Sequence, residues 1–124
     1  MAKANIITIP VTIAARTAVS EVVDLTAGNV VGIILPTDNW ADAAVTVIGS
    51  PDGVNFYDIY DGPDCKELIF NVRPGVMVAV DFNRLRCCKK LMLRSGTRED
   101  PFNQPKTCDF YVVIETGLAV VQEQ

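Results

Sequence analysis

Apolar and polar side chains alternate with period two along most of the chain, a pattern that is typical of β-strands with one buried face. In residues 7–13 every odd position is isoleucine or valine, and Pro10 lies among the polar positions between them. Because proline cannot donate a hydrogen bond to a strand ladder, this segment is predicted to be an edge strand or an extended arm. Near the other end the same alternation predicts an inward-facing set, namely Cys108, Phe110, Val112 and Ile114.

Short strands separated by turn residues are expected throughout. The apolar run Val30–Leu35 is predicted to be a central strand that is covered on both faces. The other expected strands are Val19–Leu25, Ala44–Ile48, Val54–Tyr60, Lys66–Val72, Val76–Phe82, Lys89–Arg94 and Thr107–Thr116. Single helical turns are expected near 36–43, where Thr37 or Asp38 would cap exposed N–H groups, and at 83–88.

About eight or nine short strands with Gly, Pro and Asp between them indicate an all-β fold, an antiparallel β-sandwich of jelly-roll-like type. The length of 124 residues, with 49% hydrophobic and 21% charged residues, indicates one globular domain over 1–124. Two interpretations of residues 1–10 stay open, an extended N-terminal arm that reaches a neighbour and an internal edge strand. Residues 117–124 likewise are predicted to be either a C-terminal tail that reaches a neighbour or an internal edge strand.

The chain contains no histidine, which removes the Ser-His-Asp and Cys-His nucleophile pairs and the commonest general base near neutral pH. Glycine-rich phosphate-binding motifs are also missing. The sequence therefore predicts a protein without enzymatic activity, without catalytic residues and without a cofactor. It shows no secretory signal and no apolar stretch of about eighteen residues, so no membrane partner is expected.

The net charge of −4 is unevenly distributed. Residues 1–64 hold two cations and eight carboxylates, a balance of −6, while residues 65–124 hold nine cations and seven carboxylates, a balance of +2. Six of the cations lie within Arg84–Arg98. An acidic chain is a poor binder of phosphate backbones, so this cluster is interpreted as outward-facing cations or a contact surface for an acidic neighbour, with no nucleic-acid partner.

Neither the cysteines nor the acidic residues match a metal site. Cys65, Cys87, Cys88 and Cys108 do not have the Cys-x-x-Cys spacing of structural zinc sites and are interpreted as reduced thiols. The segment 52–64 is rich in aspartate, which is compatible with calcium but not with the spacing of an EF-hand loop. Asp-Gly at both ends favours ordinary turns, and no metal is expected.

Aromatic side chains gather in residues 40–60, where Trp40, Phe56 and Tyr60 are expected to fill one end of the core. Phe56 and Ile59 form the expected inward pair, which requires a bulge between them. Of these aromatic residues, Tyr57 is then the one expected to lie outside the core, where it can contact a partner.

The order of several short motifs resembles a family of small β-sandwich structural proteins from tailed bacteriophages. The residues that carry this likeness are Leu35-Pro36, Trp40, Ala43–Val47, Ser50–Tyr60, Leu91–Thr97, Asn103-Gln104 and Phe110–Glu115. The resemblance covers roughly residues 30–115 and implies a capsid cement or decoration protein that clamps neighbouring major capsid subunits. The cations and cysteines at 84–90 depart from the family pattern. A looser likeness to discoidin-type jelly rolls, through 50–56 and 91–93, implies the alternative of a glycan-binding module on a phage fibre or tail, although Phe56 replaces the usual tryptophan.

The sequence thus predicts a virion protein that is assembled in the host cytoplasm, lies on the capsid surface, binds the major capsid protein and forms a dimer or trimer. The residues expected to contact a partner are Ile6, Ile7, Ile9, Pro10, Tyr57, Arg84, Arg86, Arg94 and Arg98.

Overall fold

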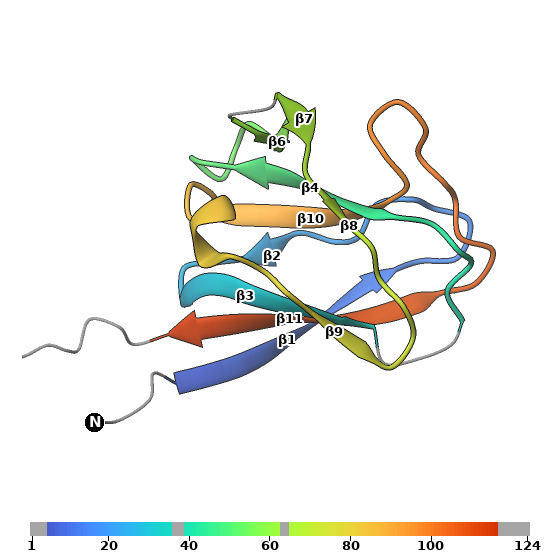
Figure 1. Ribbon diagram of the computed structural model, residues 1–124, viewed down its shortest axis with the longest axis horizontal. Helices are drawn as coiled ribbons and strands as arrows, with labels where there is room; N and C mark the ends of the chain where they lie inside the picture. The colour runs from blue at the N-terminus through green and yellow to red at the C-terminus, as the bar shows by residue number, and fades with distance from the viewer. Residues whose placement is uncertain (1–4, 36–38, 63–64, 117–124) are drawn as a thin grey trace, which may run out of the picture.

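A computed structural model describes residues 5–35, 39–62 and 65–116 and shows an all-β fold of antiparallel sheets. Two layers face each other, as Figure 1 shows. Sheet A has the order β1-β11-β3-β9, made of β1 (Asn5–Ile13), β11 (Cys108–Thr116), β3 (Gly28–Leu35) and β9 (Val76–Ala79). Sheet B has the order β2-β10-β4-β5, made of β2 (Val23–Asp24), β10 (Lys90–Ser95), β4 (Val45–Ser50) and β5 (Tyr57–Asp58), and β8 (Ile69–Phe70) also pairs with β4. This confirms the expected antiparallel all-β class, while jelly-roll connectivity stays a prediction.

A small hairpin of β6 (Tyr60–Asp61) and β7 (Lys66–Glu67) lies beside sheet B (Figure 1). The sequence predicts continuous strands at 54–60 and 66–72, but each is divided. The division follows from backbone bonds at Ile59, whose N–H donates to Val47 O at 3.2 Å and whose carbonyl accepts from Leu68 N at 2.9 Å. Ile59 thereby stays against the core, while the residues after it turn away into the hairpin.

The core lies between sheets A and B and is built from the alternation seen in the sequence. Cys108, Phe110, Val112 and Ile114 all have no exposed surface, as expected. The Trp40 ring meets the Phe110 ring edge to face, with centroids 5.2 Å apart. A row of side chains that runs across sheet A, namely Ile9, Val112, Ile33 and Val78, faces this core.

Other expectations are corrected by the structure. Residues 39–44 are not helical, and the cap expected at Thr37 or Asp38 lies outside the described residues. A single helical turn does form near 83–88, as the 3-10 helix η1 (Phe82–Arg84), which the Asp81 side chain caps through Asn83 N. Of the expected strand Val19–Leu25 only β2 forms. Strand β3 is central in sheet A, but only its inner face is fully covered, since Ile34 on the other face is half-buried.

Candidate functional site

The outward face of sheet A carries two cross-strand rows of side chains without charge. The register pairs Pro10 with Tyr111, Tyr111 with Ile34 and Ile34 with Met77, so that one row crosses all four strands. The second row consists of Thr8, Val113, Gly32 and Ala79. We call these two rows together with Ile6 the sheet A outer face.

Several large apolar side chains of the sheet A outer face are open to solvent. Met77 is 60% exposed, Ile6 53% and Tyr111 39%. A Cβ built on Gly32 would lie 3.3 Å from Met77 Sδ, so the methionine side chain extends over this glycine. Charged residues occur only toward the ends of the same face, at Asp109 and Glu115 of β11. The arrangement is an apolar centre with a polar rim, which is the usual composition of a protein–protein interface core.

The N-terminal residues expected to contact a partner lie in edge strand β1 of sheet A. Residues 5–13 pair with residues 108–116 of the same chain, and among the described strands only β11 pairs with β1 (Figure 1). Ile6, Ile7 and Pro10 are exposed, whereas Ile9 is half-buried against the core. The described part of the N-terminal arm is therefore a strand of the domain, while residues 1–4 and the tail at 117–124 lie outside the described residues.

Arg94 was expected on a contact surface, and the structure corrects this. Its side chain is only 7% exposed because two carboxylates enclose it. Nη1 lies 2.6 Å from Asp58 Oδ1, and Nη2 lies 2.5 Å from Glu67 Oε2. Nε donates to the Thr46 hydroxyl at 3.0 Å. Arg94 does point outward from sheet B, but the segment carrying β5, β6 and β7 folds over it, so it serves the interior of the chain.

The other predicted cations also meet acceptors in the same chain. Arg98 Nε lies 3.3 Å from Asp58 Oδ2, and Arg84 Nη1 lies 3.0 Å from Asp61 Oδ2. Arg86 donates to Asn83 Oδ1 at 3.3 Å. The acidic segment before residue 64 and the cationic segment after residue 84 are therefore partners of each other. The opposite charge balance of the two halves is the sequence signal for this contact, although the sequence alone predicts outward-facing cations or a surface for an acidic neighbour.

Asp52 lies in a turn, as expected for the first end of the aspartate-rich segment, whereas Asp58 and Asp61 lie in strands β5 and β6. Its carboxylate accepts hydrogen bonds from the backbone N–H groups of Asn55 and Val54, both at 2.8 Å, and from the Ser50 hydroxyl at 3.0 Å. These hydrogen bonds hold the pKa of Asp52 far below its ordinary value, and the bond from the Asn55 backbone N–H has the largest effect. Tyr57, which follows this turn, is 59% exposed as expected, whereas Tyr60 is 42% exposed and does not fill the core as the sequence predicts.

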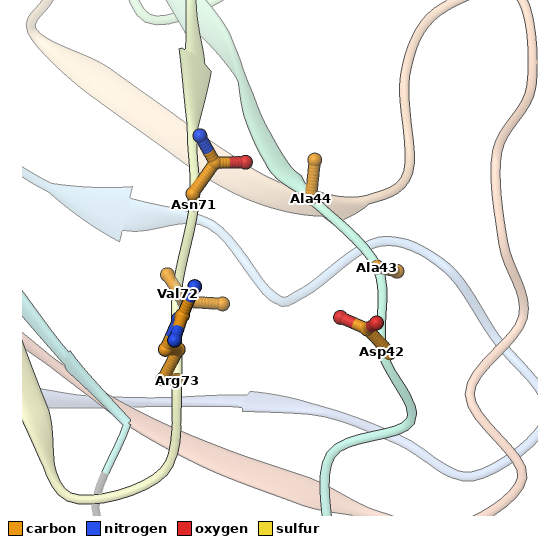
Figure 2. A pocket seen from close by; sticks show the side chains of 6 residues that line it. All are labelled: Asp42, Ala43, Ala44, Asn71, Val72 and Arg73. Carbon is orange, nitrogen blue, oxygen red and sulfur yellow. The ribbon is translucent and has the colours of Figure 1, made fainter.

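An open recess of about 600 Å³ lies where the segment before β4 passes the segment after β8. Figure 2 shows Asp42, Ala43 and Ala44 on one wall, and Asn71, Val72 and Arg73 on the other. The carbonyls of Ala43 and Ala44 are already bonded, to Trp40 Nε1 at 3.0 Å and Gly96 N at 2.8 Å. Asp42 and Arg73 are both exposed, and neither offers a buried polar group aimed into the recess. The recess therefore gives no argument for a particular ligand.

Thiols and acids do not converge on a common point in the described ranges. No group of three or more Cys, Asp or Glu side chains there could hold a metal ion. Cys88 is half-buried beside Cys87, with the sulfur atoms 3.9 Å apart, and burial raises the pKa of Cys88 to about 12. Within residues 5–35, 39–62 and 65–116 no helix is long and apolar enough to cross a membrane.

The sequence did not reveal the sheet A outer face, because its rows join residues from four separate strands. The outward position of each residue follows from local alternation, but the strand order that brings Pro10, Tyr111 and Met77 into one row does not. No protein-family model, curated protein or solved structure matches this chain.

Proposed function

We propose that this chain is a non-enzymatic structural protein of a virion, which binds major capsid subunits at the capsid surface and bridges them after synthesis in the host cytoplasm. The observation that carries the proposal is the sheet A outer face. Tyr111 and Met77 stand exposed in rows that contain no charge, and an apolar partner surface would remove them from water without desolvating any ion. The choice of a capsid as partner rests on the resemblance to phage structural proteins.

The proposed mechanism is mass action. A ligand that binds only the assembled shell stabilises it by RT ln(1 + [L]/Kd), or roughly 2.7 kcal/mol for each site when the ligand is at about one hundred times Kd. Repetition over symmetric copies multiplies the effect. A rigid sandwich suits this task, because little conformational entropy is lost when a preformed face docks.

The experiment compares particle binding by the natural chain and two charge variants. Met77→Glu places a carboxylate on the sheet A outer face, and Val54→Glu is the matched control, because Val54 is 77% exposed in the turn that precedes β5. Particles are banded on a density gradient, and the bound chain is quantified by mass spectrometry against the commonest shell protein.

We expect the natural chain and Val54→Glu to travel with particles in a fixed, near-stoichiometric ratio. Met77→Glu should lose at least about tenfold in affinity, because its new charge would be buried without a partner. The proposal is wrong if the natural chain runs free of particles, or if Met77→Glu binds as well as Val54→Glu.

Glycan binding on a fibre or tail is the second candidate, and the exposed tyrosines favour it. Tyr57 is 59% and Tyr60 42% exposed. A hydrogen bond with the Tyr60 side chain raises the pKa of Arg98 above its ordinary value, so a cation lies beside one of the rings. Sugar-dependent binding on a glycan array that disappears in Tyr57→Ala would support this candidate, whereas the capsid proposal predicts no such signal.

A further inference from the structure

We infer that two copies of this chain pair through the free edge of β1, in antiparallel register about a two-fold axis at Ile7. The inference concerns self-association and goes beyond the proposed function. It begins from the alternation of backbone hydrogen bonds in an antiparallel pair, where every second residue directs its N–H and C=O away from the neighbouring strand.

Two observations show which residues of β1 direct these groups outward. The N–H of Thr12 donates to Glu21 Oε1 at 2.6 Å, so it points away from β11. Pro10 has no N–H and lies two residues before Thr12, at a position whose N–H would also point outward. By the same alternation Ile6 and Thr8 present their N–H and C=O groups to the free edge.

The two halves of this edge therefore differ. In the second half, proline removes one donor and Glu21 occupies the next, which are common ways to protect an edge strand. In the first half, no group of the described residues accepts a hydrogen bond from the N–H of Ile6 or Thr8. Ile6 is 53% and Ile7 40% exposed.

A second copy of β1 fits the open half because the pattern is self-complementary. When Ile7 lies opposite the same residue of the other copy, Ile6 lies opposite Thr8, and each such pair exchanges both of its N–H···O bonds. Centring on Thr8 instead would place Ile6 opposite Pro10, whose missing N–H would leave a carbonyl unpaired. The whole strand Asn5–Ile13 contains no charged residue, so no like charges meet in the pairing.

The pairing selects a dimer over a trimer, the two states that the sequence leaves open. An isologous two-fold contact uses the open edge of both copies, so growth stops at two. The pairing also extends sheet A across the axis with both outer faces on the same side, since residues directly opposite each other in a sheet share a face. One dimer would then present two sheet A outer faces to a partner.

The test is a charge exchange at Ile7 in the full chain, without particles, which separates it from the test of the proposed function. Association is measured by sedimentation equilibrium over about 1–500 µM, because a short strand pair lies at the small end of interface sizes and a micromolar Kd is expected. The variants are Ile7→Lys and Ile7→Glu, each alone and mixed in equal amounts. The matched control is Ile69→Lys in β8 of sheet B, where Ile69 is 45% exposed.

We expect a monomer–dimer equilibrium for the natural chain and for Ile69→Lys. Each Ile7 variant alone should dimerise at least about tenfold more weakly, because like charges then face each other across the axis. Mixing the two should restore association as a heterodimer. The inference is overturned by a monomeric natural chain, by a trimer, by Ile7 variants that associate as the natural chain does, or by a mixture that shows no recovery.

Hydrogen exchange gives a second readout that does not depend on any variant. The amides of Ile6 and Thr8 should become protected as the chain concentration rises, because they are bonded only in the dimer. The amide of Thr12 should not change, since Glu21 holds it in the monomer. Equal responses of Thr8 and Thr12 to concentration would overturn the proposed register.

Discussion

Removal of the Arg94 guanidinium should be among the most destabilising changes on sheet B. The side chain is 7% exposed and bonded to Asp58, Glu67 and Thr46 at 2.6, 2.5 and 3.0 Å. Breaking a buried ion pair by removing one partner costs about 3–5 kcal/mol, because the remaining charge is left without compensation. In the variant, Arg98 Nε still lies 3.3 Å from Asp58 Oδ2, and the backbone N–H of Arg98 still donates to Glu67 Oε2 at 2.9 Å. We therefore expect Arg94→Ala to lower the free energy of unfolding by about 3 kcal/mol, at the small end of that range.

Stability is measured by urea denaturation and, in a separate experiment, by thermal unfolding, with Arg98→Ala as the matched control. Arg98 pairs with the same aspartate, but its side chain is 56% exposed and screened by water, so its loss should cost much less than the loss of Arg94. For a domain of this size, a loss of about 3 kcal/mol corresponds to a fall in Tm of roughly 10–15 °C.

A triple variant tests the physical reason. Arg94→Met combined with Asp58→Asn and Glu67→Gln removes the cation and both carboxylates, and it should recover most of the stability lost in Arg94→Ala. The reasoning is refuted if Arg94→Ala costs no more than Arg98→Ala, since the burial of the guanidinium would then have no energetic consequence.

Three further predictions follow from single sites. Gly75→Ala should lower the free energy of unfolding by about 1 kcal/mol, because of its φ of 77° alone. Gly96→Ala should lower it by at least about 3 kcal/mol, because φ is 87° and the new Cβ would lie 2.4 Å from a backbone oxygen. Urea denaturation measures both, and equal losses of stability would contradict the clash at Gly96. Because the folded pKa of Asp52 lies below its ordinary 3.8, its stabilisation is present above about pH 4 and is lost as the pH falls through the folded pKa, so the Tm advantage of the natural chain over Asp52→Asn should shrink between about pH 5 and pH 2. Because its pKa is about 12, Cys88 should react with iodoacetamide at about pH 8 much more slowly than exposed Cys87. Tandem mass spectrometry can locate the modified cysteine, and a faster reaction at Cys88 would contradict its burial.

Period-two alternation predicted which face of a strand each residue lies on, because this depends on the strand alone. It placed Phe110 and Val112 in the core, made 7–13 an edge strand in one of its two interpretations, and put Arg94 on the outward side of its strand. It could not predict what covers an outward side, since that depends on segments distant in the sequence. Glu67, 27 residues from Arg94 along the chain, closes over the guanidinium only because the backbone turns away from sheet B at Ile59.

The same reasoning explains why the two outward faces of the sandwich differ. On sheet B, Asp58 of β5 and Glu67 of β7 place two carboxylates on Arg94, so charges of opposite sign compensate each other within the chain. On sheet A the described chain lays no segment over Tyr111 and Met77, and their rows contain no charge that could hold one there. A partner that covers sheet B must compete with ion pairs already formed, whereas a partner that covers sheet A displaces only water. The apolar face is therefore the surface where added contact area contributes most to binding, and Met77→Glu is the substitution that tests it most directly.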